Sequence, residues 1–304
     1  MLNSIIVTGA TSMIGVALIE EAIAIGVQVY AIVRPNTTRL ERLPTSKLIH
    51  IIYSDLEGLK NVQISVECDV FYHFAWEGVS KEQRDDPLIN EKNIRYTLDA
   101  VELAKRLGCK KFIGAGSQAE YGQVDGEIGI NTRPLPVLAY GISKYAAGKL
   151  SRKLCDQYGM VHIWGRIFSV YGRWDNKNTL LDYAITQFMK GEIAQFSSGK
   201  QEWNYLFEKD AGRIFMAIGE QIEESTELIV ASDETRPLRE FVEILADEME
   251  CEVLCEFAED AGNHVVGLNP DVTATEKKLN IYDFIPFRQG IKQMIEHYRV
   301  KKNE

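Results

Sequence analysis

The stretch Thr8-Gly9-Ala10-Thr11-Ser12-Met13-Ile14-Gly15 decides the fold. It follows the short apolar run Ile5–Thr8 and leads into Ile14–Ile25, whose apolar residues have helical spacing up to Gly26. Glycines allow a tight turn and close approach, and a helix N-terminus offers free N–H groups to a pyrophosphate. The stretch therefore predicts a dinucleotide-binding turn, the alternative being a plain strand-to-helix turn. Ser12 stands where the middle glycine usually lies, and its hydroxyl can donate to a phosphate.

Strand and helix patterns alternate over the first two-thirds of the chain. Further strands are expected at Val27–Val33, Leu48–Tyr53, Val70–Ala75, Lys111–Ala115 and Val161–Ser169, and helices at Asn93–Leu107 and Tyr140–Tyr158. Such alternation indicates βαβ units and a parallel sheet covered on both faces. The sequence thus predicts an α/β fold with a Rossmann doubly wound parallel sheet.

After Gly172 the alternation loosens. The expected elements there are helices at Thr179–Lys190, Leu238–Glu250 and Phe287–Tyr298 and strands at Trp203–Phe207 and Leu228–Ala231. We interpret this part as a smaller, partly discontinuous C-terminal substrate lobe. The predicted dinucleotide-binding domain spans residues 1–170, with about 205–232 returning to it, and the substrate lobe spans 171–204 and 233–304.

The composition narrows the class of protein. The 304 residues carry a formal net charge of -10, with 45% hydrophobic and 26% charged residues, which is ordinary for a globular protein. The acidic balance argues against nucleic acid as a partner, and no apolar run approaches the ~18 residues of a membrane span. Five scattered cysteines predict reduced thiols in a cytoplasmic protein. Cys251 and Cys255 have no second pair or nearby histidine, so no metal site is expected.

The residues after the second and third predicted strands bear on the cofactor. An acid after the second strand would bind the adenosine ribose of NAD, whereas an arginine suits the 2′-phosphate of NADP. Arg34 occupies this place, with Arg39 and Arg42 nearby to add charge, and so favours NADP(H), with NAD(H) as the alternative. Asp55 and Leu56 are expected near the adenine, although Asp55 can equally be an exposed loop residue.

A tyrosine and a lysine four residues apart provide the candidate catalytic pair. Tyr140 and Lys144 lie on one face of a predicted helix, where the ammonium favours the tyrosinate. Tyr140 can then exchange a proton with a substrate hydroxyl or carbonyl. Ser117, at a predicted strand end, can orient the substrate oxygen. Asn93 stands at a helix start and can be merely an N-cap.

These motifs, in this order and spacing, resemble the extended short-chain dehydrogenase/reductase family, in its NAD-dependent epimerase/dehydratase group that acts on nucleotide sugars. The matching segments cover nearly the whole chain and are Thr8–Gly15, Ser54–Leu56, Phe71–Trp76, Asn93–Thr97, Gly116–Gly122, Tyr140–Lys144 and Arg166–Gly172. The resemblance implies a catalytic triad of Ser117, Tyr140 and Lys144, with Asn93 in support. The predicted cofactor-binding residues are Gly9, Thr11, Ser12, Met13, Ile14, Gly15, Arg34, Asp55, Leu56, Phe74, Ala75, Asn93, Lys144 and Ile167. The predicted substrate-binding residues are Gln118, Ser169, Arg173, Thr179, Trp203 and Tyr205.

The sequence departs from this family at two places. The dehydratase branch carries a Thr-Asp-Glu stretch, whereas Ser117-Gln118-Ala119 has no carboxylate, which argues against dehydration. Glu120 is displaced by one residue and, in an extended segment, is expected to face away. Trp203 stands where an arginine often grips the substrate diphosphate, so Arg173, Arg236 or another arginine would have to supply that charge.

Three functions remain open on this evidence. The favoured one is NADP(H)-dependent reduction of a nucleotide-linked 4-keto-sugar, with Tyr140 as proton donor. The alternatives are an NAD-dependent nucleotide-sugar 4-epimerase and a cofactor-sensing binding protein without activity. The resemblance also implies a homodimer built from the helices Asn93–Leu107 and Tyr140–Tyr158. The two helices carry more apolar residues than one stripe facing the sheet requires, which supports this pairing. These residues are Leu98, Val101, Leu103, Ala146, Ala147, Leu150 and Leu154.

Overall fold

A parallel sheet of seven strands forms the larger half of the protein in a computed structural model that describes residues 2–177, 179–259 and 267–303. The strands lie in the order β11-β7-β5-β4-β1-β2-β3. Their bounds are β1 Ser4–Thr8, β2 Gln28–Val33, β3 Ile49–Tyr53, β4 Val70–His73, β5 Lys111–Ser117, β7 Val161–Ile167 and β11 Thr226–Val230. Every neighbouring pair is parallel. The predicted doubly wound Rossmann sheet is confirmed. The strand order reverses between β1 and β4, because β2 and β3 extend the sheet on one side of β1 and the later strands extend it on the other.

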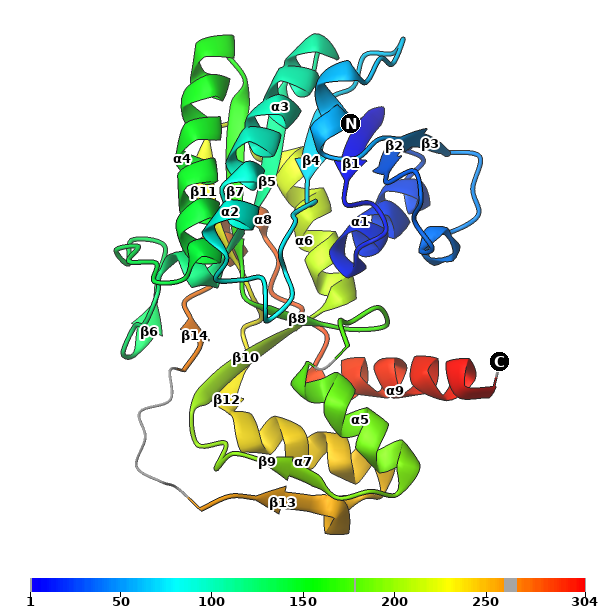
Figure 1. Cartoon of the computed structure of the whole chain (residues 1–304), viewed down its shortest axis with the longest axis vertical. Helices are drawn as coiled ribbons and strands as arrows, with labels where there is room; N and C mark the ends of the chain where they lie inside the picture. Colours follow the sequence, from blue (N-terminus) through cyan, green and yellow to red (C-terminus); the bar gives the residue numbers. More distant parts are fainter. Residues whose placement is uncertain (1, 178, 260–266, 304) are drawn as a thin grey trace.

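Helices cover both faces of this sheet (Figure 1). On one face, α1 (Met13–Ala24) packs against α6 (Glu208–Gln221), and their apolar residues join the largest core cluster. On the other face, α3 (Lys92–Arg106) packs against α4 (Ala139–Tyr158). Because both faces are covered, every residue of β4 and β5 is buried.

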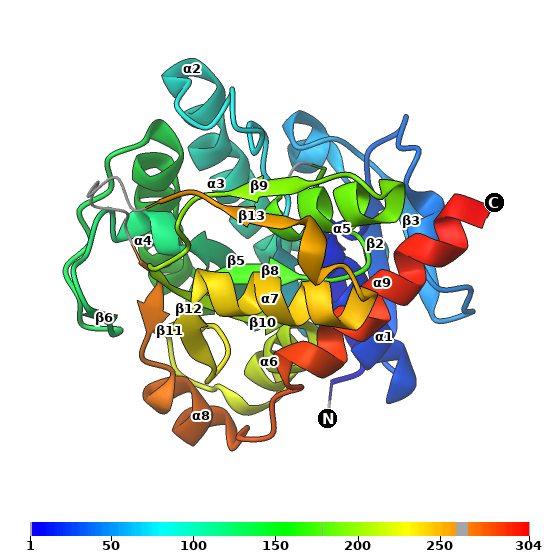
Figure 2. The same cartoon turned by 90° about the horizontal axis from the view of Figure 1, so that it is seen from below.

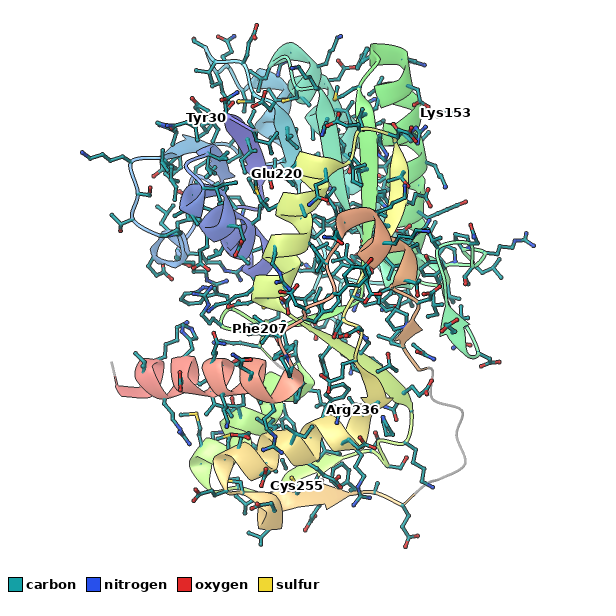
Figure 3. The ribbon with its side chains drawn as sticks, turned by 180° about the vertical axis from the view of Figure 1, so that it is seen from behind. Tyr30, Lys153, Phe207, Glu220, Arg236 and Cys255 are labelled. Carbon is teal, nitrogen blue, oxygen red and sulfur yellow. The ribbon has the colours of Figure 1, made fainter. Side chains whose placement is uncertain are left out.

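The smaller half is built around a second core. A three-stranded sheet of β8 (Ser169–Tyr171), β10 (Glu202–Phe207) and β12 (Thr235–Pro237) packs with the helices α5 (Leu180–Lys190), α7 (Leu238–Met249) and α9 (Phe287–Asn303). Figure 2 shows α7 and α9 side by side beneath the large sheet, and Figure 3 places Arg236 and Cys255 in this half. The division into residues 1–170 with 205–232, and 171–204 with 233–304, stays a prediction.

Short elements complete the described chain. They are the strands β6 (Glu127–Ile128), β9 (Ala194–Phe196), β13 (Cys255–Phe257) and β14 (Asn269–Pro270), the helices α2 (Pro87–Asn90) and α8 (Thr273–Leu279), and the 3-10 turns η1 (Leu40–Arg42), η2 (Glu57–Asn61), η3 (Gln118–Glu120) and η4 (Glu252–Leu254). Among the described residues, no helix combines the length and apolar character that crossing a membrane requires.

The predicted strand Val161–Ser169 is divided in the structure. β7 ends at Ile167, and after Phe168 the chain leaves the large sheet to form β8 beside β10. Phe207, at the end of β10, lies at the junction of the two halves (Figure 3). The two sheets therefore meet at the carboxyl ends of the large sheet's strands, where open α/β folds bind their ligands.

Candidate active site

The glycine-rich turn is fixed by contacts that admit no side chain at Gly9. This residue has a φ of +69°, and a Cβ there would lie 2.7 Å from the backbone nitrogen of Ala75. A Cβ on Gly15 would overlap the carbonyl oxygen of Gly9. The turn therefore runs closely against the end of β4 and leaves its outer surface to a ligand.

Ser12 begins α1 as its N-cap. Its Oγ accepts a hydrogen bond from the Gly15 N–H at 3.1 Å, and its own N–H donates to the Gly9 carbonyl at 2.9 Å. The N–H groups of Met13 and Ile14 have no partner within the described parts of the chain, and both belong to the first turn of the helix. They form a suitable cradle for a phosphate, to which the Ser12 hydroxyl can still donate.

A buried polar chain organises the strand ends beside this turn. Thr8 Oγ1 and His73 Nδ1 are 2.9 Å apart, and His73 Nε2 lies 3.4 Å from Thr97 Oγ1. Thr97 Oγ1 donates to the Asn93 carbonyl at 2.8 Å. Burial lowers the pKa of His73 to about 3, so the ring is neutral and links the strands without a charge.

Asn93 lies inside α3, not at its N-cap. It is fully buried, and its side-chain amide accepts from the Glu77 N–H at 2.8 Å and donates to the Glu77 carbonyl at 3.0 Å. It thereby holds the loop after β4, which carries the predicted cofactor residues Phe74 and Ala75.

The side chains predicted to lie near the adenosine of the cofactor differ in burial and in their hydrogen-bond partners. Arg34 is exposed just after β2, and Asp55 accepts from the Gly58 N–H at 2.7 Å while Leu56 is buried. Arg42 reaches the glycine-rich turn, where its Nη1 donates to the Thr11 carbonyl at 3.4 Å. Its Nε is buried without a partner among the described residues.

The three predicted catalytic residues are brought together by two elements. Ser117 is the last residue of β5, and Tyr140 and Lys144 lie in the first turns of α4. The Ser117 hydroxyl is hydrogen-bonded to the side chain of Tyr140. Lys144 Nζ donates to the Ala115 carbonyl at 2.7 Å and lies 3.7 Å from the centre of the Trp76 ring.

Burial sets the protonation of the pair. Desolvation raises the pKa of Tyr140, against the opposing charge of Arg84 and the hydrogen bond from Ser117. Desolvation also lowers the pKa of Lys144 to about 7, although the Glu120 carboxylate counteracts this. In the absence of ligands the phenol is therefore protonated at neutral pH, and Lys144 carries only part of a charge.

Glu120 contradicts the expectation that it faces away. The segment after β5 is not extended but forms η3, which turns the Glu120 side chain back beneath Ser117, where it is fully buried. Its carboxylate accepts from the Ser117 N–H at 2.8 Å, from Trp164 Nε1 at 2.9 Å and from Arg166 Nε at 2.8 Å. Arg166 also contacts Glu227 at 2.8 Å. The Glu120 carboxylate is thus buried and hydrogen-bonded to groups in the protein interior.

The predicted substrate residues lie around the junction of β8 and β10. Ser169 and Tyr205 are register partners on these strands, and Gln118 is half-buried in η3. Trp203, also on β10, is half-buried, and its ring centre lies 6.3 Å from that of Tyr205. Ile167, a predicted cofactor-binding residue, pairs in register with Ser117. It therefore lies beside the end of β5, where the catalytic residues are grouped.

Two of the predicted substrate-binding residues are hydrogen-bonded or ion-paired to neighbouring side chains. Arg173 is held by Glu208 and, at 2.6 Å, by Glu20, so its guanidinium is already paired. Thr179 is the N-cap of α5, and its Oγ1 donates to Asp175 at 2.9 Å. Arg236, the other arginine considered for the diphosphate, is paired with Glu234 and Glu240.

The sequence model described as the NAD dependent epimerase/dehydratase family matches residues 5–231. The chain belongs to this family. Members of this family are enzymes of the short-chain dehydrogenase/reductase type, and this protein is one of them.

Individual relatives are distant in sequence but alike in fold. UDP-glucuronic acid decarboxylase 1 of Arabidopsis thaliana is 22% identical over 308 residues, covering 97% of this chain and 69% of the relative. An uncharacterised UDP-glucose epimerase of Bacillus subtilis is 24% identical, covering 70% of this chain and 72% of its own. The solved UDP-N-acetylglucosamine 4-epimerase of Methanobrevibacter ruminantium, in complex with UDP-N-acetylmuramic acid, superposes with a TM-score of 0.88 at 20% identity and covers 98% and 99% of the two chains. UDP-glucuronic acid 4-epimerase of Bacillus cereus, solved with NAD, gives 0.82 at 20% identity over 97% and 96%.

Two residues of this family member's site were not found from the sequence. Trp76 packs edge-on against Tyr140 with ring centres 6.1 Å apart, and Arg84 lies over the Tyr140 ring. Trp76 falls within the matched segment Phe71–Trp76, which was the available signal for it. Arg84 lies in a loop without a motif, and only the folded chain brings it to α4.

We expect Glu120→Gln to destabilise the protein by about 3–5 kcal/mol, because it removes one charge of a buried ion pair and disturbs three hydrogen bonds. Urea denaturation measures this loss. Glu227→Gln is the matched control, since that carboxylate also pairs with Arg166 but its side chain is 30% exposed. Equal losses in the two variants would contradict the central role of Glu120.

Proposed function

We propose that the protein reduces a nucleotide-linked 4-keto-sugar with NADP(H), Tyr140 donating the proton to the sugar oxygen. The observation that carries this proposal is the grouping of Ser117, Tyr140 and Lys144 at the end of β5, where the nearby carboxylate of Glu120 is already paired with Arg166. The glycine-rich turn fits a dinucleotide, because Gly9 and Gly15 leave no room for a Cβ and two N–H groups are unpaired. When bound there, the nicotinamide supplies the hydride.

Each member of the triad has a defined task in this reaction. The Ser117 hydroxyl orients the substrate oxygen, and the Tyr140 hydroxyl gives it the proton as negative charge develops. Lys144 is anchored on the Ala115 carbonyl and stabilises the resulting tyrosinate. Bound phosphates would favour the protonated form of Lys144, whose charge burial otherwise weakens.

The state of Glu120 argues against elimination of water at this site. Dehydration needs an acid and a base beyond the tyrosine, and Gln118 and Ala119 cannot supply them. Glu120 is paired with Arg166 and buried beneath Ser117, so it does not replace them. Hydride and proton transfer remain as the chemistry available to the described residues.

Two arginines support the use of NADP(H). Arg34 is exposed at the end of β2. In dinucleotide-binding Rossmann folds, the 2′ position of the adenosine ribose lies at this place. Arg42 approaches the same edge through the Thr11 carbonyl, with its Nε unpaired among the residues described. A phosphate monoester would pair with either guanidinium.

Nucleotide-sugar 4-epimerisation with NAD is the second candidate. It uses the same triad to oxidise and re-reduce one carbon, and several solved structures with this fold are named as 4-epimerases, one of them in complex with NAD. Consumption of NADPH by a keto-sugar distinguishes the reductase from the epimerase, which has no net redox change. A cofactor-sensing protein would show neither reaction.

A homodimer through α3 and α4 is a further part of the proposal. The two helices lie side by side on one face of the protein (Figure 1). Val101, Leu103 and Ala147, expected in the interface, are buried within the protomer. Ile142 and Leu150 on α4 are 50% and 47% exposed and provide an apolar surface for a second copy.

Tyr140→Phe is expected to keep the fold and cofactor binding but to lower turnover about 10²–10⁴-fold, because it removes only the titratable hydroxyl. Steady-state kinetics with NADPH and a nucleotide 4-keto-sugar measure the loss, and cofactor titration provides the binding control. Turnover equal to that of the wild type would refute Tyr140 as the proton donor.

Arg34→Ala is expected to weaken the binding of NADPH by about 1.5–3 kcal/mol and to have little effect on the binding of NADH, because only NADPH has a 2′-phosphate. Fluorescence titration with both cofactors measures the difference. Lys190→Ala removes an exposed charge at the end of α5 and is the control. Equal weakening of NADPH and NADH by Arg34→Ala would identify Arg34 as a loop residue only.

Leu150→Glu is expected to convert a dimer to monomers of 34.4 kDa in light scattering. The monomer should be less active, since α4 carries Tyr140 and Lys144. Leu88→Glu changes an exposed leucine on α2 and should leave the dimer intact. A wild-type protein that is monomeric at micromolar concentration and fully active would overturn the dimer.

A further inference from the structure

The loop between β4 and α2 caps the helix that carries the catalytic pair. Leu138, the N-cap of α4, provides no side-chain cap. Instead, the Tyr140 N–H donates to the Arg84 carbonyl at 2.9 Å, and the Ala139 N–H donates to Asp85 Oδ1 at 3.0 Å. Two N–H groups that a helix start leaves unpaired are thus satisfied by this loop.

The capping loop is itself anchored in the interior. Asn90 is fully buried in α2, and its Nδ2 donates to the Gln83 and Asp86 carbonyls, both at 2.9 Å. The backbone on either side of Arg84 is therefore held in place. The position of Arg84 relative to Tyr140 follows from backbone contacts and does not depend on its side chain.

The Arg84 guanidinium lies directly against the Tyr140 ring. Its central carbon is 4.5 Å from the ring centre, and its Nε is buried without a hydrogen-bond partner among the described residues. No carboxylate in the described part of the chain forms an ion pair with Arg84. Its charge is therefore directed at the aromatic ring.

The other charged groups near Tyr140 are less able to favour its ionised form. Lys144, on the same helix, has its Nζ 5.8 Å from the ring centre, and burial, together with the charge of Arg84, lowers its pKa to about 7. Glu120, from η3, opposes ionisation but is paired with Arg166. Asp85, beside Arg84, is bound to the start of α4. A guanidinium, by contrast, remains charged throughout the working pH range.

We propose that Arg84 is a positioning residue that holds a permanent positive charge against Tyr140 and stabilises the tyrosinate whether or not Lys144 is protonated. This inference rests on the proposed function, in which Tyr140 transfers the proton. A cation beside the phenol favours its anion, so Arg84 makes Tyr140 a stronger acid. Proton donation in the reducing direction is then easier at neutral pH.

The test is the titration of Tyr140 itself, measured without substrate. The ultraviolet tyrosinate signal of each protein, minus that of the same protein carrying Tyr140→Phe, isolates Tyr140 from the other tyrosines. Arg84→Gln and Arg84→Met should each raise the midpoint by about one pH unit, whereas Arg84→Lys should raise it less. The Arg84 carbonyl remains in all three variants, so the cap on Tyr140 is kept.

Asp85→Asn is the matched control for the structural role of the loop. It alters the cap on Ala139 without removing the cation, so it should not raise the Tyr140 midpoint. An unchanged midpoint in both Arg84→Gln and Arg84→Met would overturn the inference. Loss of the fold in both, seen as a collapsed Tm, would assign Arg84 to folding and would also overturn it.

Activity separates this inference from the proposed function. Arg84→Gln should move the alkaline limb of the kcat profile upwards in step with the Tyr140 midpoint. A protein in which Tyr140→Phe retains turnover would refute Tyr140 as the proton donor while leaving the titration result for Arg84 intact. A Tyr140-dependent enzyme whose midpoint ignores Arg84 would refute only the role of Arg84.

Discussion

The buried carboxylate of Glu120 is the contact on which the active site depends. It binds the Ser117 backbone, the Trp164 indole and the Arg166 guanidinium, and thereby joins the end of β5 to β7. Trp164 in turn packs against α4, where a Cβ on Gly148 would lie only 2.7 Å from its ring. Burying this charge is costly unless it is paired and hydrogen-bonded, and here the Arg166 guanidinium pairs with it while two further N–H groups donate to it. The positions of β5 and α4, which carry the triad, therefore both depend on the Glu120 carboxylate.

This use of Glu120 also determines the electrostatics of the site. A carboxylate that would otherwise serve as an acid or base is neutralised by Arg166, and the groups facing Tyr140 are then Lys144 and Arg84. A positive site favours the tyrosinate and attracts anionic groups such as phosphates. Among the described residues, this arrangement leaves Glu120 paired and not free to act as a second acid. Structural support and the electrostatics of the site therefore have one origin in the placement of a single side chain.

The sequence predicted what local patterns specify and missed what folding brings together. The glycine-rich turn and the strands of the large sheet follow from short-range chemistry, namely turn residues and buried apolar runs. Glu120 was misjudged because one 3-10 turn reverses the direction of its side chain relative to an extended strand. The ion pairs of Arg173, which was predicted to bind substrate, could not be foreseen, because its partners Glu208 and Glu20 lie 35 and 153 residues away in the sequence. Such pairings are properties of the topology and have no local signal.

Arg173 and Arg42 connect the two halves of the protein on either side of the glycine-rich turn. Arg173 follows β8 and binds Glu20 on α1 and Glu208 on α6, so the helix that begins at the turn is tied to the strand junction of the smaller half. Arg42 bonds to Thr11 in the turn and stacks on Trp174, 4.9 Å from the ring centre, and Trp174 also contacts His297 of α9. A ligand seated on the turn therefore lies among groups anchored in both halves. Because those groups are already joined by ion pairs and ring contacts, a dinucleotide would find its binding edge and the neighbouring wall of the smaller half largely in place before it arrives.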